Sequence, residues 1–335
     1  MTENQRTAAH WDRVLTTGDN SFSPEVYWMA VPEVHKRIQR LSTGGALTAK
    51  GVPYDVWFQY CVFEFLAARL PVERMLSVGC GTGDLERNLA LYNCFKHMDA
   101  CDISPAAIAV ARQKAVEMEI HNITFIASDI AKFPLPAEHY DVVWFNSSLH
   151  HIKDLEGTCA AIARTLKPDG FVFLNEYVGP SRFRLPARQK DAIRAAFDLL
   201  PRRFKRSSVP PRHVRAWTNA RALLQPRSLA PAPTEYYATA PYIPQPTLLA
   251  LLDPSEAVRS ADILRVLADH FQIVRKHDIG GSVLHFLLSG IAGNFVKDDP
   301  QTQGMLSMLF QIEDTLIAAG DLQSDFAVVV AQKRA

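Results

Sequence analysis

The segment MLSVGCGTGDLE, Met75–Glu86, decides the fold of this 335-residue chain. A short apolar run ends at Val78 and breaks into three glycines at alternate positions, Gly79, Gly81 and Gly83. A helical pattern of leucines follows. Glycine has no Cβ and tolerates positive φ, so a strand that turns this sharply into a helix can bring bare backbone against a ligand. The segment therefore predicts a strand, a ligand-binding turn and a helix.

Two acidic residues near this turn indicate the kind of ligand. Asp102 ends a second apolar stretch, at the distance where a carboxylate can accept hydrogen bonds from ribose hydroxyls. Asp84 stands where the dinucleotide fingerprint requires a third glycine, and its charge would repel a pyrophosphate. This pattern argues against NAD and FAD and suits a nucleoside with a cationic end, such as S-adenosylmethionine. Taken alone, the three glycines could also form a turn that binds no ligand.

The composition is typical of a soluble globular protein, with 48% hydrophobic residues, 21% charged residues and a net charge of +1. No apolar run is long enough to span a bilayer, and the polar first residues lack the apolar core of a signal peptide. The five cysteines form no CxxC pair, which favours reduced thiols. We therefore expect a cytoplasmic protein, and the sequence indicates no particular oligomeric state.

Apolar strands and amphipathic helices alternate along the chain, which predicts a parallel sheet with helices on both faces. A turn is expected at Lys167–Gly170 and a helix over Ser255–Asp269. The predicted strands are Arg74–Val78, Lys96–Cys101, Thr124–Ala127, Tyr140–Phe145, Phe171–Asn175, Phe271–His277 and Phe326–Val330.

Five motifs resemble those of the class I S-adenosylmethionine-dependent methyltransferases, and most closely those of the branch that acts on small molecules. They are VGCGTG at Val78–Gly83, Asp102 in MDACDIS, SDI at Ser128–Ile130, DVVWFNSSLHHI at Asp141–Ile152 and LKPDGFVFLNE at Leu166–Glu176. The resemblance implies an α/β fold with a doubly wound, mostly parallel, seven-stranded Rossmann-like sheet. Its last strand would be antiparallel, with N-terminal helices and a helical or irregular cap insertion added. S-adenosylmethionine would be the cofactor and S-adenosylhomocysteine the product.

The resemblance also implies roles for residues that follow the strands, where ligands of such sheets collect. The glycine backbone would lie along the methionine part of the cofactor. Asp102 would hold the ribose hydroxyls, and Asp129 would accept from the adenine amino group. Asp102, Asp129 and Asn146 could instead cap the turns that follow them. The cofactor-binding residues expected on this basis are Gly79, Cys80, Gly81, Gly83, Asp102, Ile103, Asp129, Ile130 and Asn146.

Three regions are expected: a helical lid over residues 1–70, a core from residues 71–180 and 254–335, and a cap insertion over residues 181–253. The cap is rich in proline, and its first part is basic, with thirteen Lys and Arg against two acidic residues between Ser181 and Arg227. Such a surface could attract an anionic acceptor or could simply be solvated.

Methyl transfer is an in-line displacement that needs a positioned acceptor and the exclusion of water. An alcohol or phenol must also lose a proton, so His150 or His151, after the fourth strand, is a candidate general base; a structural role is the alternative. The two histidines with Asp154 could form a metal site, but the carboxylate cluster of the catechol-type methyltransferases is not evident, so we expect no metal. The expected activity is methyl transfer to a small or medium-sized acceptor, at oxygen in preference to other atoms.

Substrate contacts are expected from residues at the sheet edge, in the lid and in the cap, each of which could instead pack or face solvent. These residues are Tyr27, Trp28, Glu176, Tyr177 and Arg182. Two other functions stay open: a nucleic-acid methyltransferase that uses the basic cap, and a cofactor-binding protein without turnover. Nucleic acid is the less expected substrate. The fourth strand is followed by NSSL, where an Asp/Asn-Pro-Pro-Tyr/Phe motif for an acceptor amine would be expected.

Overall fold

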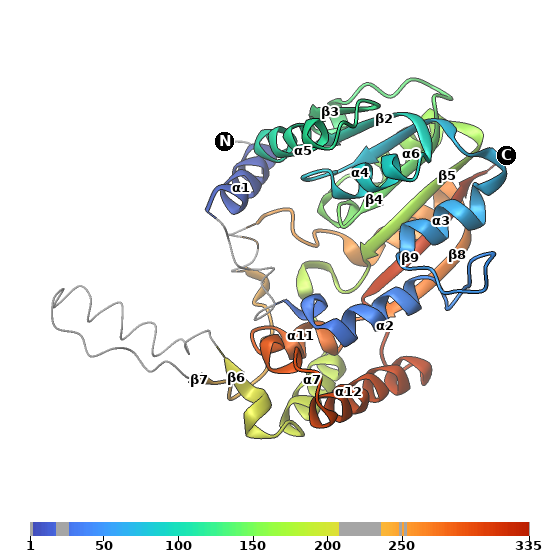
Figure 1. The fold of residues 1–335 in the computed structure, drawn as a ribbon. Helices are drawn as coiled ribbons and strands as arrows, with labels where there is room; N and C mark the ends of the chain where they lie inside the picture. Colours follow the sequence, from blue (N-terminus) through green and yellow to red (C-terminus); the bar gives the residue numbers. More distant parts are fainter. Residues whose placement is uncertain (1–2, 18–26, 208–235, 248–249, 251–252, 335) are drawn as a thin grey trace.

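The computed structural model describes residues 3–17, 27–207, 236–247, 250 and 253–334. Its centre is a seven-stranded sheet in the order β3-β2-β1-β4-β5-β9-β8 (Figure 1). The strands are β1 (Val72–Val78), β2 (Phe95–Asp102), β3 (Ile123–Ala127), β4 (Tyr140–Asn146), β5 (Leu166–Tyr177), β8 (Phe271–Gly280) and β9 (Phe326–Lys333). The strand β9 is antiparallel to both β5 and β8, while β1 to β5 run parallel. The predicted α/β fold with an antiparallel last strand is confirmed.

Helices cover both faces of the sheet. Successive strand residues point to opposite sides, and apolar residues on both sides need helices to pack against. Met75 of β1 packs with α3 (Trp57–Phe65) and α4 (Asp84–Leu91), and α5 (Pro105–Glu117) covers Ala100 of β2. Leu76 packs on the opposite face with α6 (Leu155–Thr165) and α10 (Ile263–His270). This arrangement leaves the carboxyl ends of β1, β2 and β4 as one edge on which polar side chains can meet.

A second apolar cluster joins four further helices, which Figure 1 shows grouped together at one end of the molecule. They are α2 (Pro32–Ser42), α7 (Ala187–Asp198), α11 (Leu284–Leu288) and α12 (Pro300–Ala318). The helix α1 (Glu3–Thr17) lies apart from this group and packs against α5. The predicted domain boundaries stay predictions, although α7 from the expected cap packs directly on α11 from the expected core.

Two local expectations are wrong. The strand β5 already begins at Leu166, which pairs with Tyr140, and a register shift absorbs the expected turn at Lys167–Gly170. Residues 255–262 do not continue the helix expected from Ser255, because the Asp253 carboxylate accepts hydrogen bonds from the Ser255 N–H and hydroxyl at 2.8 and 2.6 Å. Such side-chain bonds compete with helix formation. A positive φ of 47° at Ala257 then interrupts the helical path.

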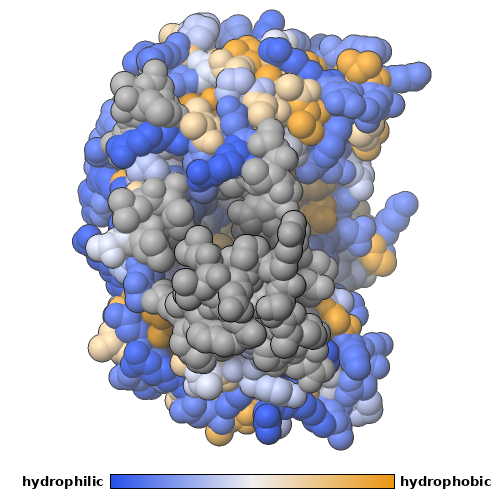
Figure 2. Space-filling model, turned by 90° about the vertical axis from the view of Figure 1, so that its left-hand side faces the viewer, coloured by the Kyte–Doolittle hydropathy of each residue, from blue (hydrophilic) through white to orange (hydrophobic). Residues whose placement is uncertain are grey.

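The arginine and proline positions of the expected cap that fall within residues 208–235 lie outside the described residues. Within the part that the structure describes, no helix combines the length and apolarity needed to cross a bilayer. Figure 2 shows that hydrophilic residues dominate the described part of one face, with hydrophobic residues in small groups toward its upper end.

Candidate cofactor and acceptor site

The turn after β1 has the conformation that its glycines predict. Gly79 and Gly81 have φ of 71° and 53°, values that L side chains rarely adopt. A Cβ at Gly79 would lie 2.4 Å from the Cβ of Ser148, so only glycine allows this turn to pass the end of β4. The Gly79 N–H donates to the Cys101 carbonyl at 2.7 Å, which ties the turn to the end of β2. The backbone of the turn is thereby exposed to the space in front of the sheet.

Asp102 joins the same turn to the helix that follows β2. Its Oδ2 accepts from the Gly81 N–H at 2.9 Å, and its Oδ1 accepts from the Ser104 N–H at 2.8 Å. Burial raises the pKa of this carboxyl, while the two backbone N–H groups lower it. A carboxylate oxygen has two lone pairs, so each can still accept a hydroxyl hydrogen. Asp102 therefore both caps a turn and presents acceptors toward a ligand.

A cavity of about 1020 Å³ lies in front of these residues. It is lined by every expected cofactor-binding residue except Gly83, which instead precedes α4 in a left-handed conformation. Asp129 contributes a carboxylate whose Oδ1 also accepts from the Ala131 N–H at 3.0 Å. Asn146 accepts at its Oδ1 from the Asn175 amide at 3.0 Å. The volume is at the upper end of the usual range for ligand pockets and allows two molecules to lie side by side.

The helix α1 closes one side of this cavity. Thr7 and Trp11 line it, and the Trp11 ring meets the His151 ring edge-on with centroids 5.4 Å apart. The next residue, Asp12, accepts from the Ser104 hydroxyl at 2.5 Å and from the Ala106 N–H at 3.1 Å. The first turn of α5 therefore holds α1 in place over the cavity.

Glu86 is a buried carboxyl in the cavity wall. Its Oε1 accepts from the Ser77 hydroxyl at 2.5 Å, while its Oε2 is buried and has no hydrogen-bond partner among the described residues. Burial raises its pKa to about 7. A buried oxygen without a donor is costly unless a ligand supplies one, so this position suits a cationic group.

The two histidines follow β4 in a single turn of 3-10 helix, Leu149–His151, but they face differently. His151 lines the cavity, whereas His150 lies behind it, 7% exposed. The Nδ1 of His150 is 2.7 Å from Oε2 of Glu176, and Glu176 also accepts from the Ser148 and Leu149 N–H groups at 2.7 Å. Glu176 is thus an internal anchor of this turn, and it does not line the cavity.

The surroundings shift the pKa values of the two imidazoles in opposite directions. Burial alone would lower the pKa of His150, but the Glu176 carboxylate beside it raises that pKa above its usual value. Burial and the adjacent His150 lower the pKa of His151. The Nδ1 of His151 lies 3.1 Å from the Ser255 hydroxyl.

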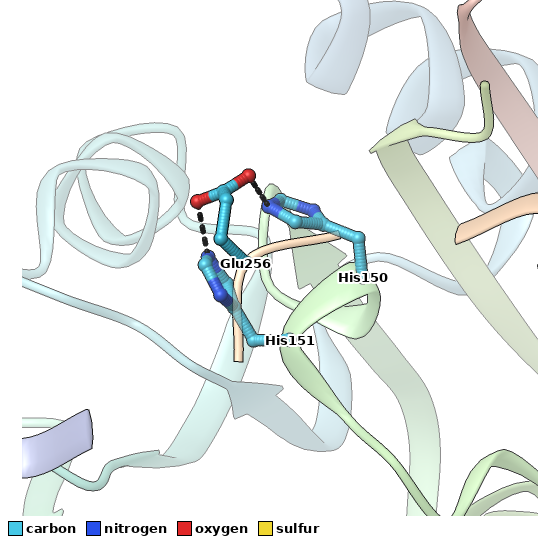
Figure 3. Close-up of side chains that lie close together, drawn as sticks. All are labelled: His150, His151 and Glu256. Carbon is cyan, nitrogen blue, oxygen red and sulfur yellow. Dashed lines mark ion pairs between the residues drawn. The ribbon is translucent and has the colours of Figure 1, made fainter. Parts of the chain in front are cut away.

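A third residue, Glu256, completes this group (Figure 3). Its Oε1 is 3.8 Å from Nε2 of His150, and its Oε2 is 3.9 Å from Nε2 of His151. Figure 3 shows its carboxylate between the two imidazoles, carried by a separate segment of the chain. We name His150, His151 and Glu256 the HHE cluster. Glu256 was not predicted from the sequence, because it lies over a hundred residues from the histidines in a segment that was expected to be helical.

The other expected substrate contacts do not reach the cavity. Trp28 is 1% exposed and packs with Phe326 and His285, and Tyr27 packs beside the same cluster. The centroid of the Tyr177 ring lies 4.8 Å from the centroid of the Phe183 ring, so Tyr177 packs away from the cavity. The Arg182 guanidinium donates to the carbonyls of Pro254 and Glu256, and its backbone N–H donates to Ala257. Arg182 therefore supports the turn that carries Glu256.

The glycine turn, the carboxylates after β2 and β3, and the cavity between them have the arrangement that the sequence predicted for a nucleoside-cofactor site in a Rossmann-like α/β protein. Residues 76–174 match a family model described as a methyltransferase domain. This match assigns a methyltransferase domain to that part of the chain, in agreement with the motifs that the sequence shows there.

Similar proteins agree with this assignment. The chain is 30% identical over 130 residues to ubiquinone/menaquinone biosynthesis C-methyltransferases UbiE from Stutzerimonas stutzeri (strain A1501) and Pseudomonas aeruginosa (strain LESB58). These alignments cover 38% of this chain and 50% of each relative, so the chain spans about half the length of the curated relatives it matches.

A solved structure extends the likeness in fold to the whole chain. Geranyl diphosphate C-methyltransferase from Streptomyces coelicolor A3(2), in complex with Mg2+, geranyl diphosphate and S-adenosyl-L-homocysteine, aligns with a TM-score of 0.51. The alignment covers 100% of this chain and 99% of that chain at 12% sequence identity. At this identity the likeness concerns the fold alone.

Proposed function

We propose that this protein transfers the methyl group of S-adenosylmethionine to an oxygen atom of a small or medium-sized acceptor and releases S-adenosylhomocysteine. The observation that carries the proposal is the cavity at the carboxyl ends of the strands. The backbone of the glycine turn, the Asp102 and Asp129 carboxylates and the His151 imidazole all line it. A cofactor and an acceptor can therefore meet between the turn and the histidine.

The residues of the wall suit each part of the cofactor. Asp102 would accept from the ribose hydroxyls and Asp129 from the adenine amino group, with Ile130 and Phe133 packing on the ring. Glu86 lies in the wall beside the glycine turn, where its carboxyl would attract the ammonium of the methionine part. When bound, the cofactor supplies an electrophilic methyl carbon on a sulfonium. The protein contributes by holding the acceptor in line with that carbon and by excluding water.

The acceptor would lie beside His151, the member of the HHE cluster that lines the cavity, and its hydroxyl would lose its proton there. Glu176 fixes the His150 ring through Nδ1 and turns Nε2 toward Glu256. We therefore extend the predicted general-base role of His150 or His151 to the whole HHE cluster, which would deprotonate the acceptor. An acceptor carbon is the rival, because the relatives are named C-methyltransferases.

The charges around the cluster favour a neutral hydroxyl over an anionic acceptor. Glu256 and the buried Asp253 carboxylate flank the histidines, and the Arg182 guanidinium is already engaged by backbone carbonyls. Arginines in the described part of the expected cap also have partners within the chain: Arg188 pairs with Asp321, and Arg202 lies over the Tyr237 ring. These contacts weaken the alternative of a nucleic-acid substrate. The five cysteines are free thiols, which supports the predicted cytoplasmic location.

The proposal is tested with a panel of phenols, alcohols and carbon nucleophiles and with methyl-labelled cofactor. We expect label in a small acceptor at oxygen, identified by mass spectrometry and NMR of the product. Label at carbon would overturn the O-methylation proposal and leave methyl transfer intact. Cofactor binding without label in any acceptor or in RNA would indicate a binding protein without turnover.

A further inference from the structure

The HHE cluster has the composition of a metal site that the sequence did not indicate. Two imidazoles and one carboxylate from two separate segments bring one ligand atom each to within 4.8 Å of one another. Two histidines and a glutamate with an open fourth position form a known ligand set of catalytic zinc, and first-row divalent ions share such sites. Bond lengths of about 2.0–2.2 Å place tetrahedral ligand atoms about 3.3 Å apart. The two imidazoles face different oxygens of Glu256, at 3.8 Å for Oε1 and 3.9 Å for Oε2, so the side chains would have to move closer together around one ion.

The second hydrogen-bonding nitrogen of each histidine supports this interpretation. The Nδ1 of His150 is held by Glu176 at 2.7 Å, and the Nδ1 of His151 lies 3.1 Å from the Ser255 hydroxyl. Both Nε2 atoms consequently point to the same carboxylate. A metal-bound histidine usually donates its other N–H to a carboxylate, a carbonyl or another oxygen acceptor, which fixes the tautomer and the ring orientation.

The charge of the cluster also calls for a cation. Carboxyl groups of Glu176, Glu256 and Asp253 each lie within 3.8 Å of an imidazole nitrogen of the pair. The Oδ2 of Asp253 is buried, and no described residue donates a hydrogen bond to it. Buried charges are paired or coordinate metals, because desolvating them is costly.

We propose that His150 Nε2, His151 Nε2 and a Glu256 carboxylate oxygen bind a divalent transition-metal ion of the zinc class. This inference rests on the proposed function for its role: the open ligand position would take the hydroxyl oxygen of the acceptor. The bound hydroxyl loses its proton to water, and its oxygen then forms the new bond to the methyl carbon. The carbon–sulfur bond breaks with its electron pair going to sulfur, which becomes a neutral thioether. A bound cation eases the first step because it lowers the pKa of a coordinated hydroxyl group.

The test is Co2+ and Zn2+ binding to the full chain after chelation, followed by calorimetry and by the visible ligand-field absorption of Co2+. We expect one equivalent of metal bound, and a loss of affinity of tenfold or more in Glu256→Gln and His151→Ala. Glu176→Gln should weaken binding by about 10–100-fold, since it removes only the carboxylate that orients His150. The partly exposed Glu33 and the exposed His35 provide the matched controls Glu33→Gln and His35→Ala, which should bind metal like the wild type.

Two results would overturn the metal site. One is metal binding that Glu256→Gln leaves unchanged, and the other is methyl transfer that survives complete chelation but is lost in His150→Ala, which would assign direct proton removal to His150. S-adenosylmethionine titrations of the same variants show that each is folded. Metal binding without methyl transfer would contradict the proposed function and leave the metal site standing, so the two failures are distinguishable.

Discussion

The Asp12 carboxylate of α1 accepts a hydrogen bond from the Ser104 hydroxyl, 2.5 Å away at the start of α5. This contact positions Trp11 over the cavity. We predict that Asp12→Ala releases α1 and raises the dissociation rate of S-adenosylmethionine about tenfold, the effect of losing about 1 kcal/mol or slightly more from a helix cap. Stopped-flow dissociation measures this rate. Arg13→Ala, at the exposed neighbouring position, should behave like the wild type; equal rates in both variants would show that α1 does not retain the cofactor.

Glu86 makes cofactor affinity depend on pH. Burial raises its pKa to about 7, so the carboxyl is largely protonated below that pH in the free protein. An ammonium beside it favours the ionised form, so affinity should rise as the pH increases from 5.5 to 8, with release of a proton on binding. Calorimetry in buffers of different ionisation enthalpy measures both effects. We expect Glu86→Gln to lose this part of the pH dependence, and an unchanged profile in that variant would place the ammonium elsewhere.

Arg182 supports the turn that carries Glu256, which replaces its expected role as a substrate contact. Its guanidinium donates to the Pro254 and Glu256 carbonyls. We predict that Arg182→Ala lowers kcat about tenfold, because the Glu256 carboxylate is displaced, and leaves cofactor affinity unchanged. The neighbouring Arg184 is exposed, and Arg184→Ala serves as the control. A rise in acceptor KM at constant kcat would instead show that Arg182 binds the acceptor.

Asp325, at the start of β9, gives the fold a pH-dependent stability. Burial raises its pKa to about 7, with Gln189 donating to it and Glu313 adding repulsion. The folded protein then keeps a proton that the unfolded chain loses near pH 4. Stability from this group is therefore present at low pH and falls as the pH rises from about 4 to 7, by about 3 kcal/mol.

The Asp325→Asn side chain cannot ionise, so this variant avoids the loss. The free energy of unfolding of the variant should therefore increase relative to that of the wild type as the pH rises from about 4 to 7. Urea unfolding at several pH values measures the difference. The exposed Asp298 provides the control Asp298→Asn, for which we expect a constant difference from the wild type. A constant difference for Asp325→Asn as well would show that this carboxyl ionises normally in the folded protein.

Local patterns in the sequence predicted the sheet and the cofactor half of the site. The strands are apolar runs bounded by turns, and the turn residues Gly79 and Asp102 act within a few positions of a strand end, where their place in the fold follows from the sheet order. The HHE cluster was not predictable in this way. Glu256 reaches the histidines through a turn that Asp253 and Ser255 build locally, and the contacts of Trp11 depend on the packing of α1 across α5.

The account depends on a nucleoside bound at the end of β2, and calorimetric titration with S-adenosylmethionine tests this most directly. Asp102 lines the cavity, and its two oxygens face the backbone of Gly81 and Ser104. We predict one binding site in the wild type and a loss of roughly 1–3 kcal/mol in Asp102→Ala, as expected when buried hydroxyls lose their acceptor. The matched control is Asp169→Ala, at an exposed position near the start of β5, which should bind normally. Absence of binding in the wild type, or equal affinity in the wild type and Asp102→Ala, would contradict the account.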